Sequence, residues 1–277
     1  MKNNRRIMII GVGYVGAVVT KHLQDVGHEV STVDILSDRD PGLRLDYRSL
    51  RIAYLKEFTD IVWLAGHSSV GQCRGDPSGA VENNVTGLAQ LAGKLTTQRL
   101  IFASSVSVHA RAQRNMYDAT KRAAEEIIPV LYPYSWGLRF GTVCGVSPQQ
   151  RWDIMIPAMY RSARENGVIT VTNKLCRRPL LGVWDLARAI EVVIDGEDRP
   201  GLYDLASLQA RIDTIGYLVA EALNVPLKYP DGASTYDIEC QVGPFLEAYD
   251  FEYRENIASI VADLRVAYDG QPLTMEI

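Results

Sequence analysis

The feature that most constrains this chain is an apolar run that leads directly into three closely spaced glycines. Residues 7–10 are Ile-Met-Ile-Ile, and residues 11–16 are Gly-Val-Gly-Tyr-Val-Gly. An apolar run without alternation is typical of a strand buried on both faces of a parallel sheet. Glycines at this spacing permit a tight turn that brings the backbone and the next helix close to a pyrophosphate. We therefore expect a dinucleotide site made of Gly11, Gly13, Tyr14, Val15 and Gly16.

The residues after the glycines support this interpretation. Residues 14–26 have helical spacing and end at Gly27, and residues 29–34 form a second strand pattern that ends in Asp34, 18 residues beyond Gly16. A carboxylate at that point accepts hydrogen bonds from both ribose hydroxyls of an adenosine and repels a 2′-phosphate, which favours NAD over NADP. The alternative is a glycine-rich turn without a ligand, and the combination of strand, helix and Asp34 argues against it.

Strand and helix patterns alternate along the chain. Further strands are expected at 43–46, 60–65 and 100–103, and helices at 47–58, 77–95 and 116–131. Such alternation predicts an α/β fold with a doubly wound parallel (Rossmann) sheet that binds ligands at the carboxyl ends of its strands. Beyond it we expect helices at 152–167, 185–194, 212–223 and 255–268, strands at 168–171 and 203–206, and a loop at 177–178. We predict an NAD-binding domain over 1–145, with returning elements near 178–206, and a smaller substrate-binding domain over most of 146–277.

Composition limits the partners and the compartment. A net charge of −4 gives no basic face, so no nucleic acid is expected, and an anionic small molecule would need local cations. The four cysteines (Cys73, Cys144, Cys176 and Cys240) form neither a CxxC pair nor a cluster of metal-ligand spacing. We therefore expect a reduced, cytoplasmic protein without a structural metal.

The N-terminus superficially matches a signal peptide, because Lys2, Arg5 and Arg6 precede the apolar residues 7–19. The glycine fingerprint and the absence of a small-x-small cleavage site argue against one. No other stretch approaches the roughly 18 to 20 apolar residues that a membrane span requires, so no membrane partner is expected.

A second group of residues suggests chemistry. Tyr117 and Lys121 lie four residues apart on one predicted helix face, toward the end of the strand that carries Ser105. A phenol is a poor base at pH 7, but an ammonium group and an oxidised nicotinamide beside it would favour the phenolate. Tyr117 could then exchange a proton with a sugar or alcohol hydroxyl during hydride transfer, while Lys121 holds the ribose and Ser105 contacts the reacting oxygen. The alternative, a solvated Tyr/Lys pair, is weakened by the dinucleotide fingerprint.

Together these motifs resemble the extended short-chain dehydrogenases/reductases, of the NAD-dependent epimerase/dehydratase kind that acts on nucleotide sugars. The resemblance covers about 7–207 and includes the glycine turn, Leu64-Ala65-Gly66, Asn83-Asn84-Val85-Thr86-Gly87, Phe102-Ala103-Ser104-Ser105, Tyr117-Asp118-Ala119-Thr120-Lys121 and Val183-Trp184-Asp185-Leu186-Ala187. It implies that Ser105, Tyr117 and Lys121 are catalytic, and that Lys121 also contacts the cofactor. It further implies that Asp34, Leu64, Ala65 and Gly66 bind NAD, that Asp46 lies near adenine, and that Arg178 binds a nucleotide diphosphate. The helices at 77–95 and 117–131 would pair in a homodimer.

The chain also departs from the family pattern. Ser105 and Tyr117 are only 12 residues apart, about half the family spacing, so the rim of the site is shortened. Val106-Ser107 stands where sugar 4,6-dehydratases carry Asp-Glu, which argues against that elimination. Thr142 replaces an Asn that holds the diphosphate in many members. His109 and Gly182 stand at positions often held by aromatic residues.

Two further polar groups are candidates for a second acid/base pair at the sugar. His67 and Cys144 both follow predicted strands at the carboxyl edge of the sheet. Their alternatives are a loop-stabilising imidazole and a packed, inert thiol. The predicted substrate-binding set is His67, Ser105, Thr142, Cys144 and Arg178.

The sequence therefore predicts an NAD-dependent nucleotide-sugar epimerase or ketoreductase. One alternative is a dehydrogenase or reductase that acts on a non-nucleotide carbonyl or alcohol. Another is a non-catalytic nucleotide-sensing protein on the same fold, which the presence of both Tyr117 and Lys121 disfavours.

Overall fold

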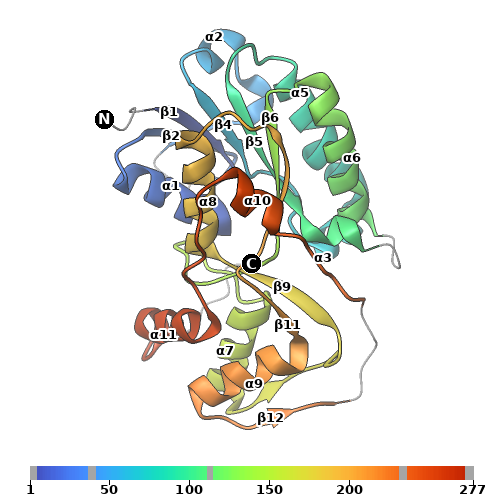
Figure 1. Ribbon diagram of the computed structural model, residues 1–277, viewed down its shortest axis with the longest axis vertical. Coiled ribbons are helices and arrows are strands. Elements are labelled where there is room, and N and C mark those ends of the chain that lie inside the picture. The colour runs from blue at the N-terminus through green and yellow to red at the C-terminus, as the bar shows by residue number, and fades with distance from the viewer. Residues whose placement is uncertain (1–4, 37–41, 111–114, 231–235, 272–277) are drawn as a thin grey trace.

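A parallel sheet with helices on both faces forms the upper part of the molecule, and a smaller lobe lies below it (Figure 1). The computed structural model describes residues 5–36, 42–110, 115–230 and 236–271. The main sheet has seven strands in the order β10-β6-β5-β4-β1-β2-β3. These strands are β1 (Arg6–Ile10), β2 (Glu29–Asp34), β3 (Leu43–Arg44), β4 (Asp60–Trp63), β5 (Arg99–Ser105), β6 (Ser135–Phe140) and β10 (Gly201–Leu205). All their pairings are parallel, which confirms the predicted doubly wound fold.

The remaining strands form two small sheets. One joins β7 (Thr142–Cys144), β9 (Arg177–Gly182) and β11 (Leu208–Arg211), and the other joins β8 (Ile169–Thr170) and β12 (Leu227–Lys228). The helices are α1 (Tyr14–Asp25), α2 (Ile52–Leu55), α3 (Val70–Gly75), α4 (Pro77–Val81), α5 (Gly87–Ala92), α6 (Met116–Leu131), α7 (Met155–Asn166), α8 (Val183–Asp195), α9 (Ile212–Leu223), α10 (Gly243–Ala248) and α11 (Ile257–Tyr268). Two 3₁₀ turns, η1 (Tyr47–Ser49) and η3 (Val106–His109), and a π-helical turn, η2 (Glu82–Thr86), complete the elements. Of the helices in the described ranges, none has the length and apolar character that a bilayer crossing requires.

The first strand is buried on both faces, as its composition predicts. Ile7 and Ile9 pack in one core with α1 and α8, whereas Met8 and Ile10 pack in a second core with α5 and α6. Figure 1 shows α1 and α8 on one side of the sheet and α5 and α6 on the other. The apolar side chains of β1 therefore join both layers, and they fix where the glycine turn begins.

Three element predictions were wrong. Residues 47–58 form η1 and the short α2 rather than one helix, since the backbone of Leu50 and Arg51 between them is extended, with ψ of 124° and 146°. The carbonyls of Arg48 and Leu50 accept hydrogen bonds from Lys94 Nζ at 3.1 and 3.0 Å. Residues 77–95 are divided by the π-helical turn η2. The arginines 177 and 178 lie in β9, where antiparallel pairing with β11 supplies the backbone partners that a loop would lack.

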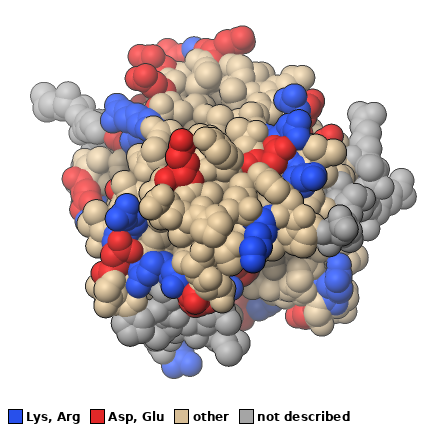
Figure 2. All heavy atoms as spheres, turned by 90° about the horizontal axis from the view of Figure 1, so that it is seen from below, with Lys and Arg blue, Asp and Glu red and all other residues tan. Residues whose placement is uncertain are grey.

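The smaller lobe has a core of its own. Its buried side chains come from α7, α9 and α11 and from the short strands beside them, and Tyr160, Ile215 and Leu264 are fully buried there. The predicted division at residue 145 stays a prediction. On the lower face of the molecule, basic and acidic side chains are interspersed among the described residues (Figure 2).

The glycine turn is joined directly to the start of this lobe. The hydroxyl group of Tyr14, the first residue of α1, donates to the carbonyl of Gly145 at 2.8 Å. In return, Ser147 Oγ donates to the carbonyl of Tyr14 at 2.7 Å. These two buried hydrogen bonds fix the N-terminus of α1 against the lobe.

A buried carboxylate caps helix α8. Glu255 Oε2 accepts a hydrogen bond from the backbone N–H of Asp185 at 2.8 Å. Glu255 Oε1 is buried and has no hydrogen-bond partner among the described residues. Burial raises the pKa of Glu255 from 4.5 to about 7, so the folded protein favours the neutral acid.

We expect Glu255→Gln to stabilise the protein at pH 8. Because the folded-state pKa is raised, the stabilising effect of the neutral acid is present below pH 4.5 and is lost as pH rises through about 7. Glutamine keeps an acceptor for Asp185 and carries no charge. The expected gain at pH 8 is about 2 kcal/mol, or roughly 4–8 °C in Tm, and it should shrink toward pH 5. Thermal unfolding at pH 8 and pH 5 measures this gain in stability, and Glu252→Gln at an exposed position is the control. Equal effects of the two variants would contradict the prediction.

Candidate functional site

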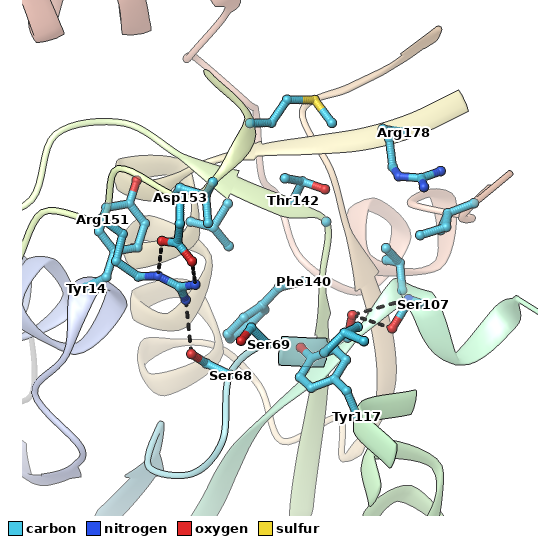
Figure 3. Close-up of a pocket in the computed structure, with 18 of the residues that line it drawn as sticks. Tyr14, Ser68, Ser69, Ser107, Tyr117, Phe140, Thr142, Arg151, Asp153 and Arg178 are labelled. Atoms are coloured by element: carbon cyan, nitrogen blue, oxygen red, sulfur yellow. Dashed lines mark hydrogen bonds and ion pairs between the residues drawn. The ribbon is translucent and has the colours of Figure 1, made fainter. Parts of the chain in front are cut away.

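A cavity of about 690 Å³ lies between the carboxyl ends of the main strands and the smaller lobe. Its lining includes residues 64–70 after β4, the end of β5, the first turns of α6 and, from the smaller lobe, residues near the start of α7. Figure 3 shows Arg151 and Tyr14 at one end, Tyr117 on the wall and Arg178 at the opposite end. The crevice expected at the carboxyl edge of a doubly wound sheet is thus present.

Ser105, Tyr117 and Lys121 meet on one wall of this cavity. Ser105 ends β5, and Tyr117 and Lys121 stand one turn apart near the start of α6. Lys121 Nζ donates to the carbonyl of Ala103 at 2.9 Å and lies 5.8 Å from the centre of the Tyr117 ring. The Ser105 side chain lowers the pKa of Tyr117. The three residues that sequence motifs singled out are therefore brought together.

Burial sets the protonation of this group. It raises the pKa of Tyr117 to about 12 and lowers the pKa of Lys121 to about 8. Burial thus favours the neutral phenol of Tyr117, and the expected phenolate, which requires a bound oxidised nicotinamide as well as Lys121, stays a prediction. Lys121 remains mainly protonated at pH 7.

The glycine turn has the shape that a dinucleotide needs. Gly11 has a φ of +97°, and a Cβ atom on Gly16 would lie 2.0 Å from the carbonyl oxygen of Gly11. Gly13 precedes α1, and no described side chain caps that helix, so its first N–H groups can face a phosphate. Tyr14, Val15, Leu64, Ala65 and Gly66 line the cavity at this end. These residues fit the pyrophosphate and nicotinamide portions of NAD.

Asp34 stands at the end of β2, beside the same turn. Its Oδ2 accepts from the Val12 N–H at 2.7 Å and its Oδ1 from the Leu36 N–H at 2.9 Å. A carboxylate has about four lone-pair positions, so acceptor capacity remains for ribose hydroxyls. Asp46 instead caps η1 and pairs with Arg48 at 2.7 Å. Its proximity to adenine stays a prediction.

His67 lines the cavity, as expected for a substrate-binding residue. Its Nε2 lies 3.3 Å from Asp76 Oδ2. Its backbone is held by Asn84, which accepts from the His67 N–H at 2.8 Å and donates to its carbonyl at 3.1 Å. Asn84 Nδ2 also donates to Thr120 Oγ1 at 3.0 Å, so the π-helical turn connects the His67 loop to the catalytic helix.

The expectation that Cys144 contacts substrate has to be corrected. Thr142 lines the cavity, but Cys144, two residues farther along β7, is fully buried in the core of the smaller lobe. Its Sγ lies 3.6 Å from the carbonyl of Leu181, and burial raises the thiol pKa well above its ordinary value. Cys144 is therefore a packed, inert thiol and cannot form an acid/base pair with His67.

Arg178 reaches the cavity from β9. Its guanidinium lies 5.5 Å from the centre of the Tyr236 ring and donates to the backbone carbonyls of Arg177 and Tyr236. Burial lowers the pKa of Arg178, yet an arginine stays cationic at neutral pH. The neighbouring Arg177 is not among the cavity residues, and its side chain is 56% exposed.

Several site residues were missed in the sequence. Arg151 donates to both oxygens of Asp153, at 2.9 and 2.6 Å, and to Ser68 Oγ at 3.0 Å across the cavity (Figure 3). Phe140 and Tyr236 also line the cavity. No motif spacing signals them, and the contact that Arg151 makes across the cavity joins segments 83 residues apart in the chain.

The fold and the site define an NAD-binding enzyme of the extended short-chain dehydrogenase/reductase type. Residues 7–206 match the family described as "NAD dependent epimerase/dehydratase family", and the chain belongs to this family. This match confirms the resemblance, the enzymatic class and NAD as the cofactor. No curated protein sequence matches the chain.

Solved structures share the whole fold at low sequence identity. MoeE5 in complex with UDP-glucuronic acid and NAD is 22% identical with a TM-score of 0.80, over 93% of this chain and 97% of that one. TunA, an NAD dependent NDP-hexosamine 5,6-dehydratase involved in tunicamycin biosynthesis, is 17% identical with a TM-score of 0.85, over 97% and 99%. UDP-glucose 4-epimerase of Thermus thermophilus, in complex with NAD, is 20% identical with a TM-score of 0.76, over 95% and 99%.

Proposed function

We propose that this enzyme interconverts epimers of a nucleotide-diphosphate sugar, with Tyr117 exchanging a proton with the hydroxyl group at the reacting carbon. The observation that carries the proposal is that Ser105, Tyr117 and Lys121 share one cavity wall, with Arg178 at one end of the cavity and the glycine turn near the other. MoeE5 was solved in complex with UDP-glucuronic acid, and the Thermus thermophilus protein is a UDP-glucose 4-epimerase. Both similarities support this substrate class.

Each residue of the site would have a distinct role toward NAD or the sugar. NAD, when bound, supplies the hydride acceptor and donor at the sugar carbon. Gly11 to Gly16 and the N-terminus of α1 would hold its pyrophosphate, and Asp34 would hold the adenosine ribose. Tyr117 would take a proton from the substrate oxygen and later return one, which needs only one acid/base group. Ser105 would orient that oxygen, and Lys121 would hold the second ribose.

A ketoreductase is the second candidate, and the raised pKa of Tyr117 is the observation that favours it. A phenol with a pKa of about 12 keeps its proton at neutral pH, so that proton is available to a carbonyl oxygen as hydride arrives. The two activities are separated by incubating the enzyme with a panel of nucleotide sugars and NAD or NADH. Epimerisation gives a new sugar signal in NMR spectra without net absorbance change at 340 nm. A ketoreductase instead consumes NADH with a keto-sugar or, in reverse, forms NADH from NAD as it oxidises a sugar hydroxyl. If no nucleotide sugar in the panel gave a new NMR signal or a change at 340 nm, both proposed activities would be contradicted.

Arg178→Ala is expected to weaken the binding of a nucleoside diphosphate. A charge-assisted hydrogen bond contributes about 1.5–3 kcal/mol, which corresponds to roughly a 10- to 100-fold increase in Kd. NAD binding should stay within about two-fold, because the glycine turn is untouched. Arg177→Ala is the matched control, since its side chain lies outside the cavity lining. Thermal shift titrations with UDP, TDP and GDP measure both variants. Equal Kd values for the two variants would overturn this role.

A further inference from the structure

A short segment covers the site where its rim is shortened. Residues 236–241, which we call the strap, precede α10 in the chain (Figure 1). Ile238 of the strap is buried in a small cluster with Val106 of η3 and with Ala110 after it. Tyr236 and Ile238 also line the cavity. The strap is therefore part of the cavity wall near Ser105.

The strap is hydrogen-bonded to β9 at the residue before Arg178. The Arg177 N–H donates to Asp237 Oδ1 at 2.7 Å, and the Ile238 N–H donates to the Arg177 carbonyl at 3.3 Å. These two hydrogen bonds hold the strap against β9 at the point from which the Arg178 side chain reaches the cavity.

Tyr236 contacts the Arg178 guanidinium in two ways. Its backbone carbonyl accepts a hydrogen bond from Arg178 Nη1, and its ring centre lies 5.5 Å from the guanidinium carbon. Nη1 also donates to the Arg177 carbonyl at 2.7 Å, so both of its N–H groups are directed at backbone carbonyls. Because a guanidinium is planar and rigid, these carbonyls and the ring of Tyr236 determine how it lies in the cavity wall.

The other end of Tyr236 is attached to the catalytic helix. Its hydroxyl donates to Asp118 Oδ2 at 3.3 Å, and Asp118 is fully buried at the start of α6. Asp118 also accepts from Ser107 Oγ and from Asn115 Nδ2, each at 2.6 Å. The carboxylate that receives the Tyr236 hydroxyl is thus itself held in place, and the ring is fixed at both ends.

We propose that Tyr236 is a positioning residue that orients Arg178 for the diphosphate group of the substrate. The inference rests on the proposed function, in which Arg178 binds that group. A long arginine side chain has many rotamers, and ordering it when a ligand binds costs conformational entropy. Tyr236 orients the guanidinium before the ligand arrives, so its contribution is expected in the affinity for a nucleoside diphosphate.

Titration with UDP, TDP and GDP tests this without turnover. Tyr236→Leu removes the ring but keeps the backbone carbonyl, and we expect the Kd to rise about 5- to 30-fold. Tyr236→Phe keeps the ring and should restore the Kd to within about three-fold of wild type. Tyr229→Leu is the matched control, because the Tyr229 ring also lies over a cation, Lys174 Nζ at 5.5 Å, but is not among the residues that line the cavity. Its Kd should stay within about two-fold.

A double-mutant cycle shows whether Tyr236 acts through Arg178. In an Arg178→Ala background, Tyr236→Leu should change the Kd less than about two-fold, because no guanidinium remains to be oriented. Losses that simply multiply would overturn the inference, and so would an unchanged Kd in folded Tyr236→Leu. Thermal unfolding shows which variants fold. Tyr236→Met, which keeps an apolar side chain without the ring, takes the place of Tyr236→Leu if that variant does not fold.

This inference and the proposed function fail in different ways. If wild-type protein binds none of the three nucleoside diphosphates, the nucleotide-sugar proposal fails and the inference fails with it. If wild-type protein binds one of them and Tyr236→Leu binds it equally well, only the inference fails. In active protein, Tyr236→Leu should raise KM by a larger factor than it lowers kcat, because Tyr117 and Lys121 keep their own contacts.

Discussion

Tyr117→Phe is expected to lower turnover by roughly 100- to 10,000-fold, the usual contribution of a positioned acid/base group. The substitution removes only the phenol hydroxyl, and the ring can keep its place beside Lys121. NAD binding should be retained, because the glycine turn and Asp34 are untouched. Steady-state kinetics and calorimetric titration with NAD measure the two quantities separately.

Tyr203→Phe provides the matched control. Its hydroxyl also donates a hydrogen bond, to the carbonyl of Arg199 at 2.8 Å, but Tyr203 is not among the residues that line the cavity. The same atom is removed in both variants, so any general effect of losing a phenol is shared. If Tyr117→Phe retained as much activity as Tyr203→Phe, Tyr117 would not be the acid/base group.

Gly11→Ala is expected to disrupt both the fold and the cofactor site. A Cβ atom at Gly11 would lie 2.5 Å from the backbone nitrogen and 2.7 Å from the Cα of Ala65, and its φ of +97° is unfavourable for alanine. Since backbone atoms of β4 and its loop cannot move aside easily, we expect a loss of about 2–5 kcal/mol in unfolding free energy. The displaced turn should bind NAD at least about ten-fold more weakly.

Gly27→Ala separates backbone strain from steric overlap. Gly27 has nearly the same φ, +99°, but no described heavy atom lies within 4 Å of a Cβ built on it. Its alanine variant should lose only about 1–2 kcal/mol, and its affinity for NAD should be unchanged. Denaturant unfolding and NAD titration of the two variants side by side test this. Equal losses would show that the contact with Ala65 is not what requires glycine at position 11.

The parts of the site that sequence could predict are those encoded by local spacing. The glycine turn follows from the order of strand, turn and helix, and the Tyr117/Lys121 pair follows from helical periodicity. Asp34 was predictable because it ends the strand that pairs with β1. Each of these depends on residues close together in the chain, so no knowledge of the lobe packing was needed.

The remaining features depend on contacts between distant segments. Arg151 meets Ser68 across 83 residues, and Tyr236 meets Asp118 across 118. The error at Cys144 has the same origin: β7 leaves the cavity after Val143 and enters the core of the smaller lobe, which spacing alone does not reveal. His109 likewise pairs with Asp204 at 2.9 Å, a contact between η3 and the edge strand β10.

The paired hydrogen bonds of Tyr14 have a consequence for how the enzyme responds to its ligands. Because Tyr14 of the glycine turn is held through both its hydroxyl and its carbonyl to Gly145 and Ser147, we expect a ligand that orders the turn also to order the start of the smaller lobe.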